Sequence, residues 1–340
     1  YKVVEDMIEE GMVASACSVG YGGIAEALFK MGLGNHIGFK MRADLTTNQM
    51  FEPMYGSIVL EMVSDAPAGE ILGETTKEYT FEACGETLDM AQLQEIWEAK
   101  LEPVYPYRKA GPTVEPITGS LTAPAAPKIG VAKPKVIIPV FPGTNCEYDT
   151  AKAFARAGAD PEILVIRNLT PADVTASCEA LVKAIDNSQI VMLPGGFSGG
   201  DEPDGSAKFI ASFFRSPAVT EAVRRLLQQR DGLMLGICNG FQALIKLGLV
   251  PYGDIRPITA YDPTLTFNTI GRHQSMLVRT RVASTGSPWL SKCAVGDEHT
   301  VAISHGEGRF VAPQEVLDTL IKNGQVATQY VDLTGTPTMD

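Results

Sequence analysis

The feature that most constrains the fold is a βαβ rhythm that begins at Lys135. Short apolar runs, rich in β-branched residues and bounded by turn residues, occur at 135–141, 162–166, 189–193 and 233–237. Helical patterns separate these runs, at about 146–157, 171–186 and 205–229. Continuous apolar strands that alternate with helices are typical of a parallel sheet covered on both faces. The second half of the chain is therefore predicted to be a doubly wound, mostly parallel α/β fold.

Composition narrows the class of protein. The 340 residues carry a formal net charge of −12 and no Lys/Arg cluster, which argues against a nucleic-acid partner. We find neither a run of about eighteen apolar residues nor a signal-peptide pattern, so no membrane partner is expected. Six cysteines lie far apart, without CxxC or Cys/His ligand spacing, so no metal site is expected. We expect a reduced, cytoplasmic protein.

Three regions are expected along the chain. Residues 1–108 have a mixed α/β pattern, with a helix at about 24–31, a strand at 57–63 and an amphipathic helix at 88–100. Residues 109–134, rich in Pro and Ala, indicate either a linker or an ordered loop packed against its neighbours. Residues 135–340 form the doubly wound domain. The chain begins without Met and ends in a turn signal, so we interpret it as a piece of a longer protein.

The strongest chemical signal is Gly236-Ile237-Cys238-Asn239-Gly240. It follows a buried strand and opens a predicted helix at about 239–247, which matches the elbow on which a nucleophile is lifted above a sheet. The start of that helix favours the reactive thiolate of Cys238. A buried structural cysteine is the alternative, and the elbow context favours catalysis.

Two further loops end predicted strands of the same sheet. Leu193 to Asp201 carries paired glycines, whose backbone N–H groups can point at a developing oxyanion. A phosphate loop is the rival interpretation, but the Lys-Ser/Thr ending of such loops is missing. The loop at 142–149 follows the first strand; there Asn145 is expected to cap a helix and Cys146 to pack half-buried.

These motifs occur in an order that resembles a known family. Pro142–Cys146, the glycine-rich stretch 195–205, Gly236–Gln242 and Ser304–Arg309 are together similar to the class I glutaminase domain of the phosphoribosylformylglycinamidine synthase family. The stretch at 201–205 resembles the large single-chain form of that family. Residues 1–108 loosely resemble the end of its synthetase part, which is similar to aminoimidazole ribonucleotide synthetase.

The resemblance implies a flavodoxin-like fold and a specific reaction. Cys238 would attack the side-chain amide of glutamine, release ammonia and form a thioester that water hydrolyses. The oxyanion and glutamine would be bound at Gly195, Gly196, Phe197, Asn239 and Gln242. Ammonia would pass to synthetase domains of the same enzyme, an ATP-dependent carbon–nitrogen ligase that converts formylglycinamide ribonucleotide to formylglycinamidine ribonucleotide in purine biosynthesis. ATP and magnesium are expected in the parent enzyme, and no cofactor in this chain.

A cysteine amidotransferase needs a histidine base and an acid that orients it. His305-Gly306-Glu307 has the His-x-Glu spacing. In the family that it resembles, however, the catalytic pair lies in a later His-x-Glu-Arg stretch, so we expect this chain to lack its base and acid. His305 and Glu307 are then expected to have a structural role. His36 is expected at a surface or interface, and His273 is expected to be solvated rather than bound to an anionic substrate.

Two other functions stay open. A catalytically silent interaction module of the same fold would leave Cys238 unmodified by a diazo-ketone glutamine analogue. A cysteine peptidase or a related α/β hydrolase would explain the elbow but not the glycine-rich stretch at 195–205.

Overall fold

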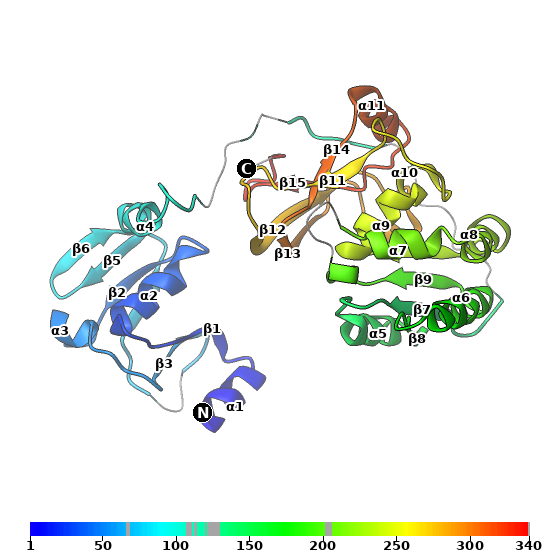
Figure 1. The fold of residues 1–340 in the computed structure, drawn as a ribbon. Helices are drawn as coiled ribbons and strands as arrows, with labels where there is room; N and C mark the ends of the chain where they lie inside the picture. The colour runs from blue at the N-terminus through cyan, green and yellow to red at the C-terminus, as the bar shows by residue number, and fades with distance from the viewer. Residues whose placement is uncertain are drawn as a thin grey trace. The chain divides into compact units, whose positions relative to one another are not determined.

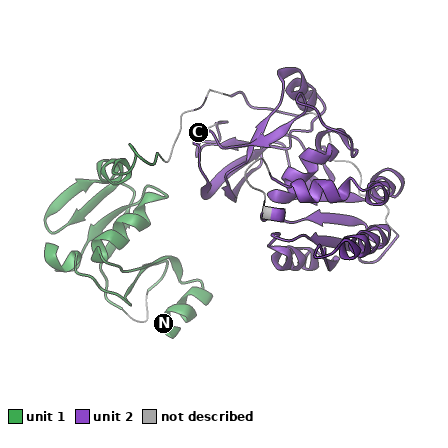
Figure 2. Ribbon diagram, in the orientation of Figure 1, with its two compact units in different colours: residues 1–107 green, residues 108–340 purple. Residues whose placement is uncertain are grey.

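The structure is a computed structural model that describes residues 1–65, 69–106, 111, 114–119, 121, 130–200 and 206–338. The chain divides into two compact units, residues 1–107 and residues 108–340 (Figure 2). The described residues contain no helix that is both long and apolar enough to cross a membrane. Each unit has its own core and is described by itself.

Unit 1 is an α+β unit with two small sheets (Figure 1). One pairs β1 (Val13–Ser18) with β3 (Ile58–Met62), and the other has the order β4-β2-β5-β6. The strands of the second sheet are β2 (Gly38–Met41), β4 (Gly73–Thr76), β5 (Thr80–Ala83) and β6 (Glu86–Asp89). The helices are α1 (Lys2–Glu9), α2 (Gly23–Leu33), α3 (Thr47–Met50) and α4 (Met90–Ala99).

The helices and the strand predicted for unit 1 are present, but the predicted apolar side of one helix is largely exposed. The predicted helix at 24–31 is α2, the strand at 57–63 is β3, and the helix at 88–100 is α4. The apolar side expected for this helix comprises Leu88, Leu93, Ile96 and Trp97, and it is wrong at three of them: Leu88 belongs to β6, and Ile96 and Trp97 are 70% and 53% exposed. Asp89 begins α4 by accepting hydrogen bonds from the amides of Ala91 and Gln92, so Leu88 stays in the strand.

The centre of unit 2 is a parallel four-stranded sheet of order β10-β9-β7-β8. In chain order the strands are β7 (Lys135–Val140), β8 (Asp160–Val165), β9 (Ile190–Leu193) and β10 (Leu233–Gly236). The predicted parallel sheet is confirmed, and the order 2-1-3-4 is that of flavodoxin-like folds. The chain reverses direction across the sheet between β7 and β9, and the carboxyl ends of such neighbouring strands form a crevice where ligands bind.

Helices cover both faces of this sheet. Residues Val136, Ile138 and Met192 pack towards α5 (Glu147–Arg156). The alternate residues Ile137, Val191 and Leu193 belong to the larger core on the other face. That core is completed by α6 (Pro171–Asp186), α7 (Lys208–Phe214), α8 (Pro217–Arg224) and α9 (Asn239–Leu247). Burial of alternate residues on both faces explains why these strands are apolar throughout.

One predicted helix is broken. The pattern at 205–229 forms α7, then α8, then a π-helical segment η2 (Arg225–Gln229). Pro217 has no amide hydrogen and disfavours helical geometry at the preceding residue, so α7 ends before Ser216 and Pro217 begins α8.

The rest of unit 2 is largely antiparallel. A three-stranded sheet has the order β13-β12-β15, and β11 pairs with β14. The strands are β11 (Thr264–Thr266), β12 (Gln274–Val282), β13 (Glu298–His305), β14 (Arg309–Val311) and β15 (Thr328–Val331). The remaining helices are η1 (Ser198–Gly200), α10 (Leu249–Tyr252), η3 (Pro288–Leu290) and α11 (Gln314–Lys322). Apolar and polar residues alternate over 275–283, a pattern typical of a more exposed strand, and β12 occupies most of this stretch.

The described part of the expected linker packs along this antiparallel sheet. The Ile117 amide donates to Gln329 Oε1 (2.6 Å), and Arg281 donates to the Ile117 carbonyl (2.9 Å). The Gly119 amide donates to the Ala283 carbonyl (2.7 Å). Residues 117–119 therefore pack against the antiparallel sheet of unit 2, while much of 109–134 lies outside the described residues, so linker and ordered loop both stay predictions.

Candidate active site

Cys238 lies between β10 and α9, on a sharp turn. Its backbone has φ 53° and ψ −112°, a conformation that non-glycine residues rarely adopt. A side chain at Gly236 would approach the carbonyl oxygen of Gly240 to 2.5 Å, and one at Gly240 would collide with the carbonyl of Leu193. Glycine is thus required on both sides because strand, turn and helix are closely packed. The Cys238 side chain itself is exposed.

The glycine-rich loop after β9 lies against the elbow. A Cβ atom built on Gly195 would be 3.3 Å from the Cys238 Cβ and 3.9 Å from its sulfur. Gly196 has φ 113°, which explains the need for glycine there. The Phe197 side chain is 62% exposed. The structure therefore brings Gly195 and Cys238 together, as the position of both loops at the carboxyl edge of one sheet predicts. Residues 201–205 of the glycine-rich stretch lie outside the described residues.

The loop after β7 is joined to the glycine-rich loop by backbone hydrogen bonds. The Asn145 amide donates to the Gly195 carbonyl (3.0 Å), and the Phe197 amide donates to the Gly143 carbonyl (2.8 Å). Thr144 and Gly196 face each other in an isolated antiparallel bridge between these bonds. In such a bridge the central residues point their N–H groups away from each other. The Gly196 amide is therefore directed away from the partner loop and is a candidate donor to a ligand.

Two predictions for the loop after β7 are wrong. Asn145 does not cap α5; Cys146 occupies the N-cap position, in a left-handed conformation, and makes no side-chain capping bond. The Asn145 side chain instead accepts a hydrogen bond from the Cys146 thiol (3.1 Å). Cys146 is exposed rather than half-buried, because the left-handed turn directs its side chain away from the sheet core.

A buried chain of hydrogen bonds supports the elbow from behind. Asn239, fully buried, accepts from the Ser198 amide (3.2 Å) and donates to Gln242 Oε1 (3.1 Å). Gln242 in turn donates to the Glu307 carbonyl (2.9 Å), and Ser206 donates to the Glu307 carboxylate (2.8 Å). The glycine-rich loop, the elbow helix and the loop after β13 are thereby tied together. The roles of Asn239 and Gln242 in binding glutamine stay predictions.

Sequence reasoning missed the part that Glu307 and Ser206 play in this chain. The two residues are separated by 101 positions, and the hydrogen bond between them depends on how the antiparallel sheet packs. No periodicity or local motif indicates such a contact.

His305 is held in its own loop. Its Nδ1 lies 3.0 Å from Asn268 Oδ1, and the Asn268 side-chain amide donates to the His305 carbonyl (2.8 Å). Its Nε2 is buried and without a hydrogen-bond partner among the described residues. Burial and, secondly, the charge of His273 lower the pKa of His305. The neutral imidazole is therefore favoured.

None of the four histidines is hydrogen-bonded to the Cys238 sulfur among the described residues. His273 Nε2 lies 2.9 Å from Ser304 Oγ on an exposed stretch, and His299 Nε2 lies 3.9 Å from the sulfur of Cys293. His36 belongs to unit 1. The structure thus supplies an exposed thiol and neighbouring backbone amides, and its described residues include no histidine hydrogen-bonded to that thiol.

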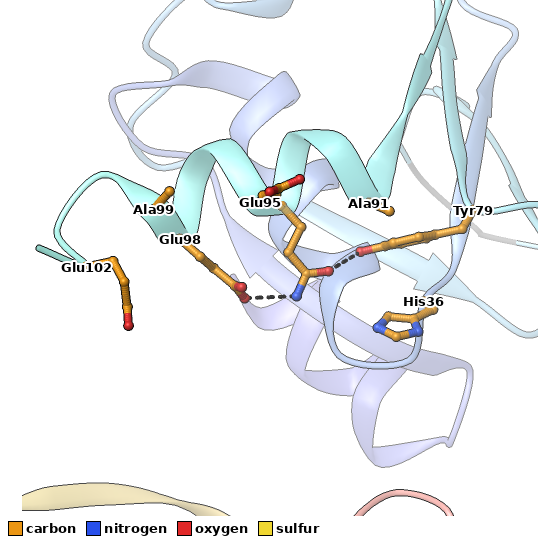
Figure 3. A pocket seen from close by; sticks show the side chains of 8 residues that line it. His36, Tyr79, Ala91, Glu95, Glu98, Ala99 and Glu102 are labelled. Atoms are coloured by element: carbon orange, nitrogen blue, oxygen red, sulfur yellow. Dashed lines mark hydrogen bonds between the residues drawn. The ribbon is translucent and has the colours of Figure 1, made fainter. Parts of the chain in front are cut away.

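Unit 1 has a separate pocket, between the turn at His36 and helix α4 (Figure 3). The Tyr79 hydroxyl donates to Gln94, and Gln94 donates to Glu98 (2.9 and 2.8 Å; Figure 3). Burial and then the charge of Glu98 raise the pKa of Tyr79. Glutamates 95, 98 and 102 line this pocket, but the described residues group no three of its side chains at metal-ligand distance. Neither a cysteine nor a serine is among the described residues that line this pocket.

Comparison with known proteins bears on this geometry. Residues 133–340 match the model of the CobB/CobQ-like glutamine amidotransferase domain. The chain is 35% identical over 198 residues to the phosphoribosylformylglycinamidine synthase subunit PurQ of Rubrobacter xylanophilus, covering 58% of this chain and 76% of that subunit. It is 38% identical over 197 residues to the PurQ subunit of Mycolicibacterium paratuberculosis, covering 58% of this chain and 74% of that subunit.

Among solved structures, the chain is similar to PurLQS from Thermotoga maritima, at 24% identity and a TM-score of 0.43 over 59% of this chain and 76% of that one. The segment that matches the family model begins two residues before β7. It includes the elbow, the loop after β7, the glycine-rich loop after β9 and the antiparallel sheet. Through residues 133–340, this chain belongs to the CobB/CobQ-like glutamine amidotransferase domain family.

Proposed function

We propose that this chain provides the glutaminase function of a phosphoribosylformylglycinamidine synthase, with Cys238 as the nucleophile. The observation that carries the proposal is the exposed thiol of Cys238, held at φ 53° on the turn between β10 and α9 and set against Gly195. Membership of a glutamine amidotransferase family, with PurQ subunits among the relatives, supports glutamine as the substrate.

The reaction follows from the groups at the elbow. The thiolate attacks the side-chain carbonyl of glutamine, and the carbonyl oxygen becomes an oxyanion. Backbone amides near Gly196 and Asn239 would stabilise that oxyanion. The amide nitrogen takes up the proton that the thiol released and leaves as ammonia, and water then hydrolyses the glutamyl thioester to glutamate and the free thiol.

The wider activity is also part of the proposal. Ammonia would pass to a synthetase partner, which uses ATP and magnesium to convert formylglycinamide ribonucleotide to formylglycinamidine ribonucleotide in the cytoplasm. On this proposal unit 1 belongs to that synthetase part. Calorimetry with ATP and magnesium on this chain is expected to show no binding, because its sequence has no phosphate-loop motif.

A covalent labelling experiment tests the nucleophile. A diazo-ketone analogue of glutamine is expected to modify Cys238, as seen by peptide mass spectrometry, and to leave Cys238→Ser unmodified. Cys146→Ser, which removes another exposed cysteine, should be labelled as the unaltered chain is. Labelling of another residue, or none at Cys238 when a synthetase partner is present, would favour a catalytically silent interaction module.

Steady-state ammonia release tests the base. Since no histidine is hydrogen-bonded to Cys238 within the part of the chain that the structure describes, we expect turnover at background level, unchanged in His305→Ala. Measurable ammonia release that disappears in His305→Ala would identify His305 as the base and contradict its structural role.

A further inference from the structure

We propose that Cys293, Asp297 and His299 form a binding site for a zinc-type divalent metal ion, apart from the elbow. The three residues lie in the turn that leads into β13 and at the start of that strand. One ligand atom of each, a thiol sulfur, a carboxylate oxygen and an imidazole nitrogen, lies within 4.8 Å of the other two. Among the described residues this is the one group of three such side chains at metal-ligand spacing.

The separations suit a tetrahedral ion. Zinc–sulfur and zinc–nitrogen bonds of about 2.3 and 2.0 Å at a tetrahedral angle place the two ligand atoms roughly 3.5 Å apart. Cys293 Sγ and His299 Nε2 are 3.9 Å apart. A small side-chain rotation therefore completes the geometry. Asp297 Oδ2 accepts the Ala294 amide (2.7 Å), which orients the carboxylate and leaves its second oxygen for the ion.

The backbone that carries these ligands is already ordered. The Gly296 amide donates to the Val282 carbonyl (2.9 Å), and the Val282 amide donates to the Asp297 carbonyl (2.8 Å). His299 is paired with Thr280 in the register of β12 and β13. Because the turn and the strand are fixed by the sheet, little conformational entropy is lost when a metal binds.

The donor set selects the metal class. Thiolate with imidazole and carboxylate favours zinc or a similar transition metal over magnesium or calcium, which prefer oxygen ligands alone. The thiol proton leaves to solvent on binding, and thiolate plus carboxylate then balance the 2+ charge. Arg281 lies on the neighbouring strand β12, and Lys292 directly precedes Cys293. Because both side chains are positively charged, neutralisation of the ion by the thiolate and the carboxylate reduces the repulsion between the ion and these cations. Asp297 and His299 are exposed, and water can supply a fourth ligand.

Titration of the full chain with Co²⁺ tests the site. We expect one equivalent to produce a thiolate-to-cobalt charge-transfer band, and Zn²⁺ to remove it by displacement. Cys293→Ser should abolish the band. His299→Gln should weaken cobalt binding by more than about 100-fold, because loss of a residue that only supports a metal ligand already weakens binding by up to about that factor. Circular dichroism verifies that each variant is folded.

Two cysteine variants provide the matched controls. Cys146→Ser and Cys238→Ser each remove an exposed thiol outside the proposed site, so both should keep the band. Absence of a band in the unaltered chain, or a band that persists in Cys293→Ser, would overturn the proposal. Loss of the band in Cys238→Ser would instead assign cobalt binding to the elbow and would equally overturn it.

Discussion

The central strands β7 and β9 of the parallel sheet are largely buried on both faces, whereas β12 and β13 of the antiparallel sheet keep most of their side chains partly or fully exposed. Ile137 and Ile138 of β7 are fully buried, while Leu277 of β12 is 70% exposed. Both regions nevertheless contribute to the surroundings of Cys238. The parallel sheet positions the thiol by close packing, and the antiparallel sheet contributes through hydrogen bonds from the loop that carries Glu307.

This difference indicates that the parallel sheet supports the elbow through packing and the antiparallel region through hydrogen bonds, so the two contributions can be removed independently. Packing in the parallel sheet is expected to carry most of the stability, because transfer of apolar surface from water is the largest favourable contribution to folding. Hydrogen bonds from the antiparallel region are expected to add smaller increments and to fix the loops.

The largest effect is expected from truncation of the buried sheet. Ile137→Ala removes a fully buried side chain and should lower the free energy of unfolding by about 4 kcal/mol. Leu277→Ala, in the antiparallel sheet, should change it by less than about 0.5 kcal/mol. Urea denaturation of both variants measures the difference. Equal losses would mean that the antiparallel sheet is as tightly packed as the parallel one.

A glycine substitution tests the packing at the elbow itself. Gly240→Ala places a methyl group against the Leu193 carbonyl and should cost about 3 kcal/mol, despite the better helix propensity of Ala. Gly306→Ala is the matched control, because a Cβ there has no neighbour within 4 Å. Thermal unfolding compares the two. A Gly240→Ala chain as stable as the Gly306→Ala chain would contradict the requirement for glycine at the elbow.

The polar contribution is tested at Gln242. Gln242→Leu removes the hydrogen bonds to Asn239 and to the Glu307 carbonyl in a buried site and should cost about 2 kcal/mol. Gln325→Leu removes an exposed side-chain bond to the Pro251 carbonyl and should cost only a few tenths of a kcal/mol. Amide hydrogen exchange in α9 and the 195–200 loop should rise in the first variant alone; unchanged exchange would argue against coupling between the loops.

The smallest effect concerns pH. The pKa of His305 is lowered in the folded chain, so the unfolded chain binds more protons just below the ordinary value of about 6.5. Stability from this group is therefore complete above that value and is lost as pH falls towards the folded pKa. His305→Gln should flatten the pH dependence of the free energy of unfolding between pH 7 and the folded pKa. An unchanged slope in His305→Gln would exclude this contribution.

The sequence predicted the parallel region well because its signals are local. The predicted helix at 171–186 has the bounds of α6, since Thr170 and Asp173 form a capping box and Pro171 occupies the first turn. The elbow and the glycine loop were predicted for the same reason, because each depends on a few consecutive residues. The sequence did not predict the helix break at Pro217, because the helical pattern continues on both sides of it. It wrongly predicted Asn145 as the cap of α5, because Asn is a preferred capping residue.

By itself, the sequence determined a doubly wound sheet, a sharp strand-to-helix turn at Cys238 and a glycine-rich loop at the same sheet edge. Strand periodicity and glycine spacing are properties of short segments, and backbone sterics translate them directly into structure. The tertiary structure alone decided that Gln242 reaches Glu307, that Asn268 holds His305, and that Cys293 faces His299. The first two contacts join residues 65 and 37 positions apart, and the third depends on how the turn before β13 folds against β12. Strand register and sheet packing bring such residues together, and no local pattern encodes either of them.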